Sequence, residues 1–300
     1  MTIYQHFSRF TCLMLVFVLV GCSQTISEPI ELPIEVIETS GLICRPQQQF
    51  ITINDSGNPA TIWTINQRGQ LIAYTETQQK NRDWEALAAN EKWLFVADTG
   101  NNSGQRKGGQ IFKYEFTDSE KLNYNTTLIY EFADIPASPL RPYQHDFDIE
   151  AIALRQADLV LFSKSWSGGA TKVYSLDSSN EQLQKIIPVT EISGLPGIVT
   201  DALWSETHQV FLVTGYANLQ QNLIALLFSG NWSPFIAVID ENYQIKAVKK
   251  LPQAGQLEAI CIDENEQVWL SQEQFKDSPA KLWRFGSIKM LIEPNSSADF

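Results

Sequence analysis

One short pattern occurs five times along the chain, and this repeat constrains the fold more than any other feature. The copies begin with "SGLIC" at 40–44, "WEALA" at 84–88, "IEAIA" at 149–153, "TDALW" at 200–204 and "LEAIC" at 257–261. After each copy come a polar turn and an apolar strand: "FITIND", "WLFVAD", "LVLFSK", "VFLVTG" and "VWLSQE". Repeats of about this length with loops of uneven size are typical of four-stranded propeller blades.

We therefore predict an all-β fold, a single β-propeller of five four-stranded antiparallel blades. The second strands are nearly continuous apolar runs, as expected where both faces of a sheet are covered. A six-bladed ring and a sandwich of irregular strands are the alternatives. The outer strand of the last blade can come from "ELPIEVIET" at 31–39 or from "IKMLIE" at 288–293, and the sequence does not choose between them.

The N-terminal segment has the pattern of an export signal. Residues 1–21 carry one charged side chain, Arg9, before an apolar run that is too short to span a bilayer. The stretch from Leu19 to Cys22 resembles the bacterial lipobox. That resemblance implies lipidation of Cys22, and Ser23 after it implies sorting to the outer membrane. A cleaved secretory signal with a chance cysteine is the alternative.

These features give the expected domain organisation and location. We assign 1–21 to a lipoprotein signal peptide, 22–32 to the lipidated N-terminus and a short linker, and 33–300 to the propeller domain. The expected location is the bacterial cell envelope, with the protein anchored to the outer membrane through Cys22 and facing the periplasm.

The charge balance limits the class of partner. The chain has 22 basic and 34 acidic residues, a net charge of −12. A body this acidic does not track a phosphate backbone, so nucleic acid is excluded as a partner. The charge suits a metal cation or a cationic ligand, although solubility alone also explains it. We expect a monomer.

Two cysteines, Cys44 and Cys261, occupy matching positions in the first strands of the first and last repeats. An oxidising compartment permits a disulfide between them. Equivalent side chains on neighbouring blades are expected to point in the same direction around the ring, which keeps their Cβ atoms apart. A disulfide needs Cβ atoms within about 3.5–4.5 Å of each other. We therefore predict two buried, reduced thiols.

The repeat also gathers polar residues at one mouth of the channel, because each first strand starts where the antiparallel second strand ends. The expected metal ligands stand at the starts of first strands: Glu85, Glu150, Asp201 and Glu258. The expected ligand-binding residues follow the second strands: Asp55, Asn58, Asp98, Asn101, Asn102, Lys164, Trp166, Tyr216 and Glu273.

Four carboxylates at equivalent positions repel one another, and a hard cation such as Ca²⁺ offsets that repulsion. Lys164, proton uptake, or bonds from the acids to backbone N–H groups of the next blade are the alternatives. Trp166 is the best candidate for an exposed aromatic platform. His145 reads as a solvated loop residue that can reach the mouth.

The motifs "DWEALA…LFVADTGNN…IFKYEF", "HDFDIEAIAL…LVLFSKSW…TKVYSL" and "GLPGIVTDALWS…VFLVTGY" resemble those of a group of secreted bacterial propellers. That group is related in architecture to SdiA-regulated, phytase-like and sugar-lactonase propellers. The resemblance implies a metal or ligand at the channel mouth. At the matching motif positions, the resemblance implies that the site residues are Glu85, Asp98, Asn101, Glu150, Lys164 and Tyr216.

Two functions fit these residues. The first is a membrane-tethered module that binds a small molecule or an envelope protein at the mouth, with or without a divalent cation. The second is a metal-dependent hydrolase of the lactonase or phosphoesterase type. In that enzyme Glu85 or Glu150 would ligate the metal, and Asp201 or Glu258 would be the general base. The sequence does not decide whether the protein is an enzyme.

Overall fold

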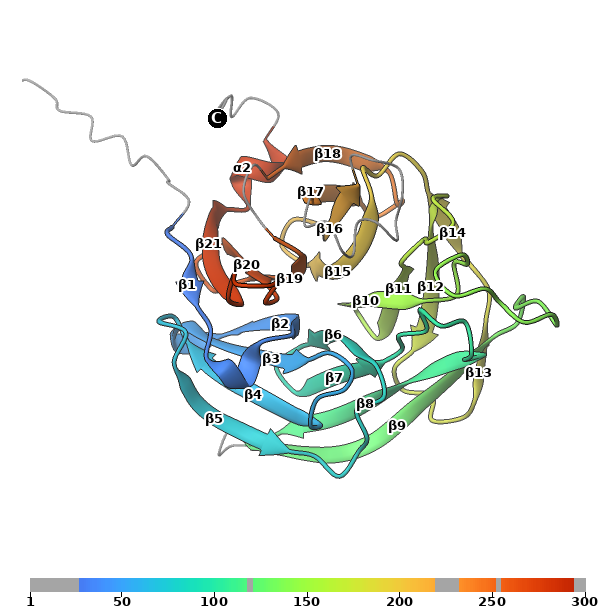
Figure 1. Ribbon diagram of the computed structural model, residues 1–300, viewed down its shortest axis with the longest axis horizontal. Coiled ribbons are helices and arrows are strands. Elements are labelled where there is room, and N and C mark those ends of the chain that lie inside the picture. The colour runs from blue at the N-terminus through green and yellow to red at the C-terminus, as the bar shows by residue number, and fades with distance from the viewer. Residues whose placement is uncertain (1–26, 118–120, 219–231, 252–254, 294–300) are drawn as a thin grey trace, which may run out of the picture.

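Each of the five repeats folds into one antiparallel sheet, and the five sheets stand around a central channel (Figure 1). This arrangement confirms the five-bladed propeller. The computed structural model describes residues 27–117, 121–218, 232–251 and 255–293. The predicted signal peptide and Cys22 lie outside these residues. Within them, no helix is both long enough and apolar enough to cross a membrane.

The strands follow the predicted order from the channel outward. Blade 1 consists of β2 (Thr39–Arg45), β3 (Gln49–Asn54), β4 (Thr61–Asn66) and β5 (Leu71–Glu76). Blade 2 consists of β6 (Trp84–Ala89), β7 (Trp93–Asp98), β8 (Gly108–Phe116) and β9 (Leu122–Phe132). Blade 3 consists of β10 (Ile149–Arg155), β11 (Asp158–Ser163), β12 (Thr171–Asp177) and β14 (Thr190–Ile192). Blade 4 consists of β15 (Ile198–Ser205), β16 (Val210–Asn218), β17 (Trp232–Asp240) and β18 (Ile245–Lys250). Blade 5 consists of β19 (Leu257–Ile262), β20 (Gln267–Gln272), β21 (Lys281–Ser287) and β1 (Ile30–Glu31). Short 3₁₀ turns, η1 and η2, cover Ile34–Val36 and Pro46–Gln48.

The outer strand of blade 3 is divided between two blades. The sequence predicts one strand at "KIIPVTE", 185–191. In the structure, β13 (Gln184–Ile186) pairs in parallel with β9 of blade 2, and β14 completes blade 3. Pro188 lies between the two short strands, and a proline has no N–H to donate to a ladder. The chain can therefore change blades at this point.

The ring closes through the N-terminal segment. Ile30 and Glu31 of β1 pair with Leu282 and Lys281 of β21. The propeller thus begins at Ile30, inside the segment predicted as a linker, which corrects that boundary. The other candidate for closure, 288–293, is not a strand.

Instead, 288–293 contains the one-turn helix α2 (Lys289–Ile292). Ile288 and Leu291 are three residues apart and both are buried, a spacing that places them on one face of a helix. Both side chains belong to an apolar cluster that also contains Leu251 and Phe285.

Apolar side chains fill the spaces between neighbouring blades. The largest fully buried ones include Trp84, Phe95, Phe162, Phe211 and Phe235, which come from three blades. Phe162 of blade 3 meets Phe211 of blade 4 edge to face, with ring centroids 5.6 Å apart. Burying both faces of each sheet explains why the second strands lack clean alternation.

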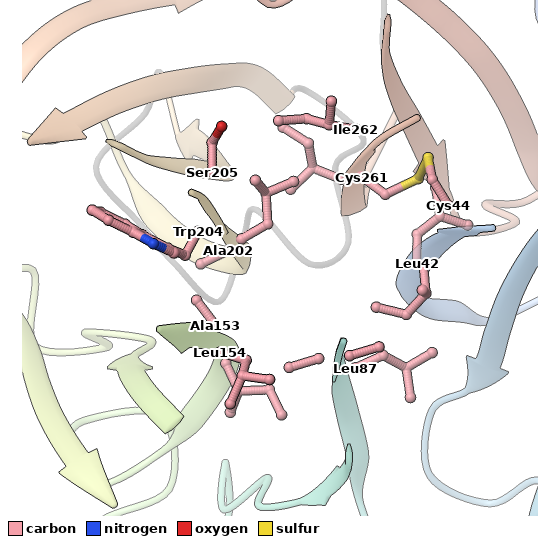
Figure 2. Close-up of a pocket in the computed structure, with 16 residues that line it drawn as sticks. Leu42, Cys44, Leu87, Ala153, Leu154, Ala202, Trp204, Ser205, Cys261 and Ile262 are labelled. Atoms are coloured by element: carbon pink, nitrogen blue, oxygen red, sulfur yellow. A yellow bond between two sulfur atoms is a disulfide. The ribbon is translucent and has the colours of Figure 1, made fainter. Parts of the chain in front are cut away.

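The prediction of two reduced thiols is wrong, because Cys44 and Cys261 form a disulfide with a Cα–Cα distance of 5.5 Å. Figure 2 shows the bond in the wall of the channel. The two residues do hold matching positions in β2 and β19. Equivalent side chains on neighbouring blades are, however, rotated by one fifth of a turn relative to each other, so their Cβ vectors are not parallel. Adjacent innermost strands also lie close together, within the normal reach of a disulfide.

The disulfide joins the first and last blades, so its loss should weaken the closed ring. We expect Cys44→Ser/Cys261→Ser to lower the free energy of unfolding by about 2–5 kcal/mol, as is usual for a native disulfide that closes a long loop. Thermal unfolding monitored by circular dichroism, with and without a reductant, measures this loss. An unchanged melting temperature in both the double variant and the reduced wild type would contradict the structural role.

Candidate functional site

The two ends of the channel differ in chemistry. Innermost strands β2, β6, β10, β15 and β19 line it, and their C-terminal halves enclose a cavity of about 210 Å³. Figure 2 shows Leu42, Leu87, Leu154 and the disulfide around this cavity. The N-terminal starts of the same strands form the other end, which we call the mouth, and there the side chains are mainly acidic.

A β-bulge near the start of the first strand positions three of the acids at the mouth. In blades 2, 3 and 5 the ladder skips one residue, and the skipped residues are Glu85, Glu150 and Glu258. Blade 1 skips Gly41 at the same point. A bulge leaves one residue out of the pairing and turns its side chain to a new direction. The three glutamates therefore share one orientation at the mouth.

Blade 4 departs from this pattern. Its ladder skips Thr200, so Asp201 stays paired with Thr214. The Asp201 carboxylate accepts hydrogen bonds from the N–H groups of Ala202 and Ile260, both at 2.9 Å. Ile260 belongs to blade 5, so this acid links two blades, the structural role that the sequence left open. A metal-binding role for Asp201, and equally for Glu150 and Glu258, stays a prediction.

Three carboxylates converge in the mouth between blades 1 and 2. Asp55, Asp83 and Glu85 each place one oxygen within 4.8 Å of the others. Burial, together with neighbouring acids, raises the pKa of Asp55 to about 6 and that of Asp83 to about 7. Burial, followed by Asp55 and Glu150, raises the pKa of Glu85 well above its usual value. The trio is thus a group of mutually repelling acids in which Glu85 is buried and Asp55 and Asp83 are half-buried.

Asp83 was not among the predicted site residues. It lies two positions before Glu85, next to the start of β6, and alternate residues of an extended segment lie on one side. That spacing is the signal that identifies it from the sequence.

Lys164 supplies a positive charge to the same mouth. Its Nζ lies 2.8 Å from Glu150 Oε2, and both side chains are buried. Burial alone lowers the pKa of Lys164, but Glu150, Tyr216 and Glu258 raise it well above its usual value, so the ammonium stays protonated. Burial raises the pKa of Glu150 to about 7 even with Lys164 opposing the shift.

The expected platform residue is not a platform. Trp166 is only 4% exposed and donates its Nε1–H to Asp148 Oδ2 at 2.6 Å. Its ring lies 5.0 Å from Lys164 Nζ and packs edge to face on Tyr143. It belongs to the wall of the mouth, because strand β11 ends three residues before it and the chain then turns.

Several buried polar atoms of the described residues lack a hydrogen-bond partner, and two of them belong to residues that act electrostatically on Lys164. Among the described residues, Glu258 Oε1 and Tyr216 Oη are buried and have no hydrogen bond. Burial raises the pKa of Glu258 to about 8. Buried polar groups without a protein partner usually bind water or an ion.

Most of the remaining predicted residues organise the loops around the mouth. Asn101 donates from Nδ2 to the carbonyls of Phe147 and Arg106, at 2.8 and 3.0 Å. Asn58 donates to the carboxylate of Glu38 and to the carbonyl of Asp55. The same asparagine side chains thus stabilise the turns and hold the loops that carry the acids.

Three further residues near the mouth are partly or fully buried. Asn102 is half-buried, and its carbonyl accepts the N–H of Tyr143. Glu273 is half-buried as well; burial and then Glu258 raise its pKa well above the usual value. His145 is 5% exposed and accepts the N–H of Phe147 at Nδ1, so its prediction as a solvated loop residue is wrong. The loop before blade 3 folds back over it.

The raised carboxyl pKa values predict how stability changes with pH. A carboxyl whose pKa is higher in the folded than in the unfolded state stabilises the fold while protonated and loses that contribution as pH rises through the folded value. For Asp55, Asp83, Glu150 and Glu258 these values are about 6, 7, 7 and 8.

We therefore expect the melting temperature of the cation-free protein to fall between about pH 5 and pH 8. Differential scanning calorimetry in a chelating buffer measures it. A melting temperature that rises over this interval would refute the electrostatic description of the mouth.

Comparisons with known proteins find only distant structural likenesses. No protein-family model matches the chain, and no curated protein matches it. Among solved structures, a glucose dehydrogenase-like putative oxidoreductase of Thermus thermophilus shares 11% identity at a TM-score of 0.47, over 87% of this chain and 99% of its own. The PQQ-bound aldose sugar dehydrogenase of Streptomyces coelicolor shares 10% at 0.46, over 87% and 97%. A luciferin-regenerating enzyme shares 10% at 0.45, over 86% and 95%. At these values the likeness carries no argument about function.

Proposed function

We propose that the mouth of this propeller binds a divalent cation of the Ca²⁺ type through Asp55, Asp83 and Glu85, and that the cation holds a ligand there. The observation that carries the proposal is the convergence of three carboxylate oxygens within 4.8 Å. Hard cations take carboxylate, carbonyl and water oxygens, and six to eight of them for Ca²⁺. The donor set fits that class of ion.

The energetics of the mouth favour a bound cation. Buried carboxylates that repel each other must take up protons or bind a positive charge. Lys164 compensates Glu150, to which it is bonded, and the acids of the trio need a further positive charge. A divalent ion supplies it without titration of the site.

The backbone packs tightly against the trio. Gly100 lies directly against the carboxylates of Glu85 and Asp83, and a Cβ at this position would collide with both. Only a glycine allows the backbone of this loop to approach so closely. The unpartnered Glu258 Oε1 and Tyr216 Oη offer further polar atoms at the same end of the channel.

Cation binding is tested with Glu85→Gln, which keeps shape and removes one charge. Isothermal titration with CaCl₂ and a thermal shift in excess Ca²⁺ should show binding by the wild type, since a ligand that binds only the folded state raises the melting temperature. We expect at least a tenfold weaker affinity in Glu85→Gln. Its cation-free melting temperature should not fall, because the change relieves repulsion.

Glu91→Gln is the matched control. Glu91 is exposed in the turn between β6 and β7, at the face opposite the mouth, and its loss should leave the affinity unchanged. Absence of heat and of any thermal shift with Ca²⁺, Mg²⁺, Mn²⁺ and Zn²⁺ would refute the proposal.

A metal-dependent hydrolase is the second candidate, and the pKa values of Glu150 and Glu258, about 7 and 8, favour it. Carboxyls that titrate near neutral pH suit general acid–base catalysis beside a Lewis-acidic ion. Cation-dependent hydrolysis of lactone or phosphoester probes that Glu258→Gln abolishes would identify the enzyme. Cation binding without turnover of either class would identify the binding module.

We further propose that a lipid on Cys22 tethers the body to the envelope. The support is the lipobox-like stretch that ends at Cys22 and the apolar run before it. Metabolic labelling with a fatty acid should mark the wild type and not Cys22→Ala. Labelling of the variant would refute the anchor.

A further inference from the structure

We infer that Asp98 and Arg106 act as a positioning pair for the cation site and are not themselves ligands of the ion. The inference rests on the proposed function and deepens it. The two residues hold the peptide of Asp83 and the loop that carries Gly100, and these elements surround the converging carboxylates.

Protein donors use both oxygens of the Asp98 carboxylate. The side chain is fully buried at the end of β7. Its Oδ1 accepts from Asp83 N–H at 3.1 Å and from Arg106 Nη1 at 3.0 Å, and its Oδ2 accepts from Gln110 Nε2 at 2.8 Å. A carboxylate committed to three donors has little capacity left for a metal ion.

Arg106 extends this contact to the next loop. Its Nη1 also donates to the carbonyl of Gly100 at 3.0 Å, and its Nη2 donates to the carbonyl of Asp98 at 2.5 Å. The backbone N–H of Arg106 donates to Asn101 Oδ1 at 2.7 Å. One planar guanidinium therefore ties the end of β7 to the loop that follows it, which an ammonium cannot do with the same geometry.

Asp83 is consequently held on both sides of its backbone. Its N–H is bonded to the Asp98 carboxylate, and its carbonyl accepts from the N–H groups of Thr99 and Gly100, at 3.1 and 3.2 Å. These contacts fix the backbone of Asp83, and with it the point from which its side chain extends, relative to Glu85. They also press Gly100 against both carboxylates.

The Asp98–Arg106 pair holds the Asp83 backbone and the Gly100 loop without adding net charge to the mouth. Asp98 and Arg106 form an ion pair, with side-chain exposures of 0% and 20%. A neutral positioning element does not increase the repulsion among the acids that it orients. Partners of this kind set the geometry of metal ligands, and their loss usually weakens metal affinity by about 10–100-fold.

The test compares two variants of the pair with a ligand variant and a control. Asp98→Asn keeps the side-chain volume and removes the negative charge. Arg106→Lys keeps the positive charge and removes the planar guanidinium with its several N–H donors. We expect each to weaken Ca²⁺ affinity about tenfold or more in isothermal titration. The double variant should be little weaker than the worse single one, because the two residues act through one contact.

The luminescence lifetime of bound Eu³⁺ in H₂O and D₂O gives the number of coordinated waters and separates positioning from ligation. At saturation, Asp98→Asn and Arg106→Lys should keep the wild-type number, whereas Glu85→Gln should gain water. Arg155→Lys is the control, since Arg155 donates to the carbonyl of Glu241 at the opposite end of the channel.

Wild-type affinity in either variant of the pair would overturn the inference, and so would an additional water in Asp98→Asn. Failure of the wild-type protein to bind any cation is a different result. It would overturn the proposed function, and the inference with it.

Discussion

A ring of blades is stable only if its first and last blades adhere, and in this protein a closing strand and a disulfide add to the apolar packing between blades 1 and 5. On the outside, β1 adds two residues to blade 5, and flanking bonds from Ser27 and Leu32 extend the contact. On the inside, the Cys44–Cys261 disulfide joins β2 to β19. The outer contact alone is short for a closing strand. The covalent bond at the channel wall secures the same seam from the inside.

The seam matters for the mouth because the acids come from both sides of it. Asp55 follows a strand of blade 1, whereas Glu258 and Glu273 belong to blade 5 or its loops. Repulsion among these groups tends to separate the blades, since burial leaves little water between them to screen the charges. A closed ring fixes their distance, and a bound cation would convert the repulsion into an attraction. Fold closure and site electrostatics are therefore coupled.

The sequence predicted the five blades, because strand periodicity and the spacing of the repeat are local features; that the residues at the mouth bind a ligand or metal stays a prediction. The sequence did not predict any of the bulges, and in blade 4 the bulge falls on Thr200, so that Asp201 accepts a backbone N–H of blade 5. Nor did it predict the disulfide, which depends on the rotation between blades and not on strand alternation. Trp166 and His145 were placed in solvent because their burial depends on how loops fold over the mouth, which no local pattern records.

The strand β13 has a consequence for how the molecule comes apart. β13 lies between β12 and β14 of blade 3 in the chain but pairs at the edge of blade 2, so blade 3 cannot move away from blade 2 without straining or breaking this pairing. The disulfide has a comparable effect on chain connectivity, because it closes a covalent loop across a sequence separation of 217 residues. A single cut in any exposed turn within that loop leaves both pieces covalently joined. The mouth loops between Cys44 and Cys261 are thus places where the chain can be opened, or new termini introduced, without losing the ring.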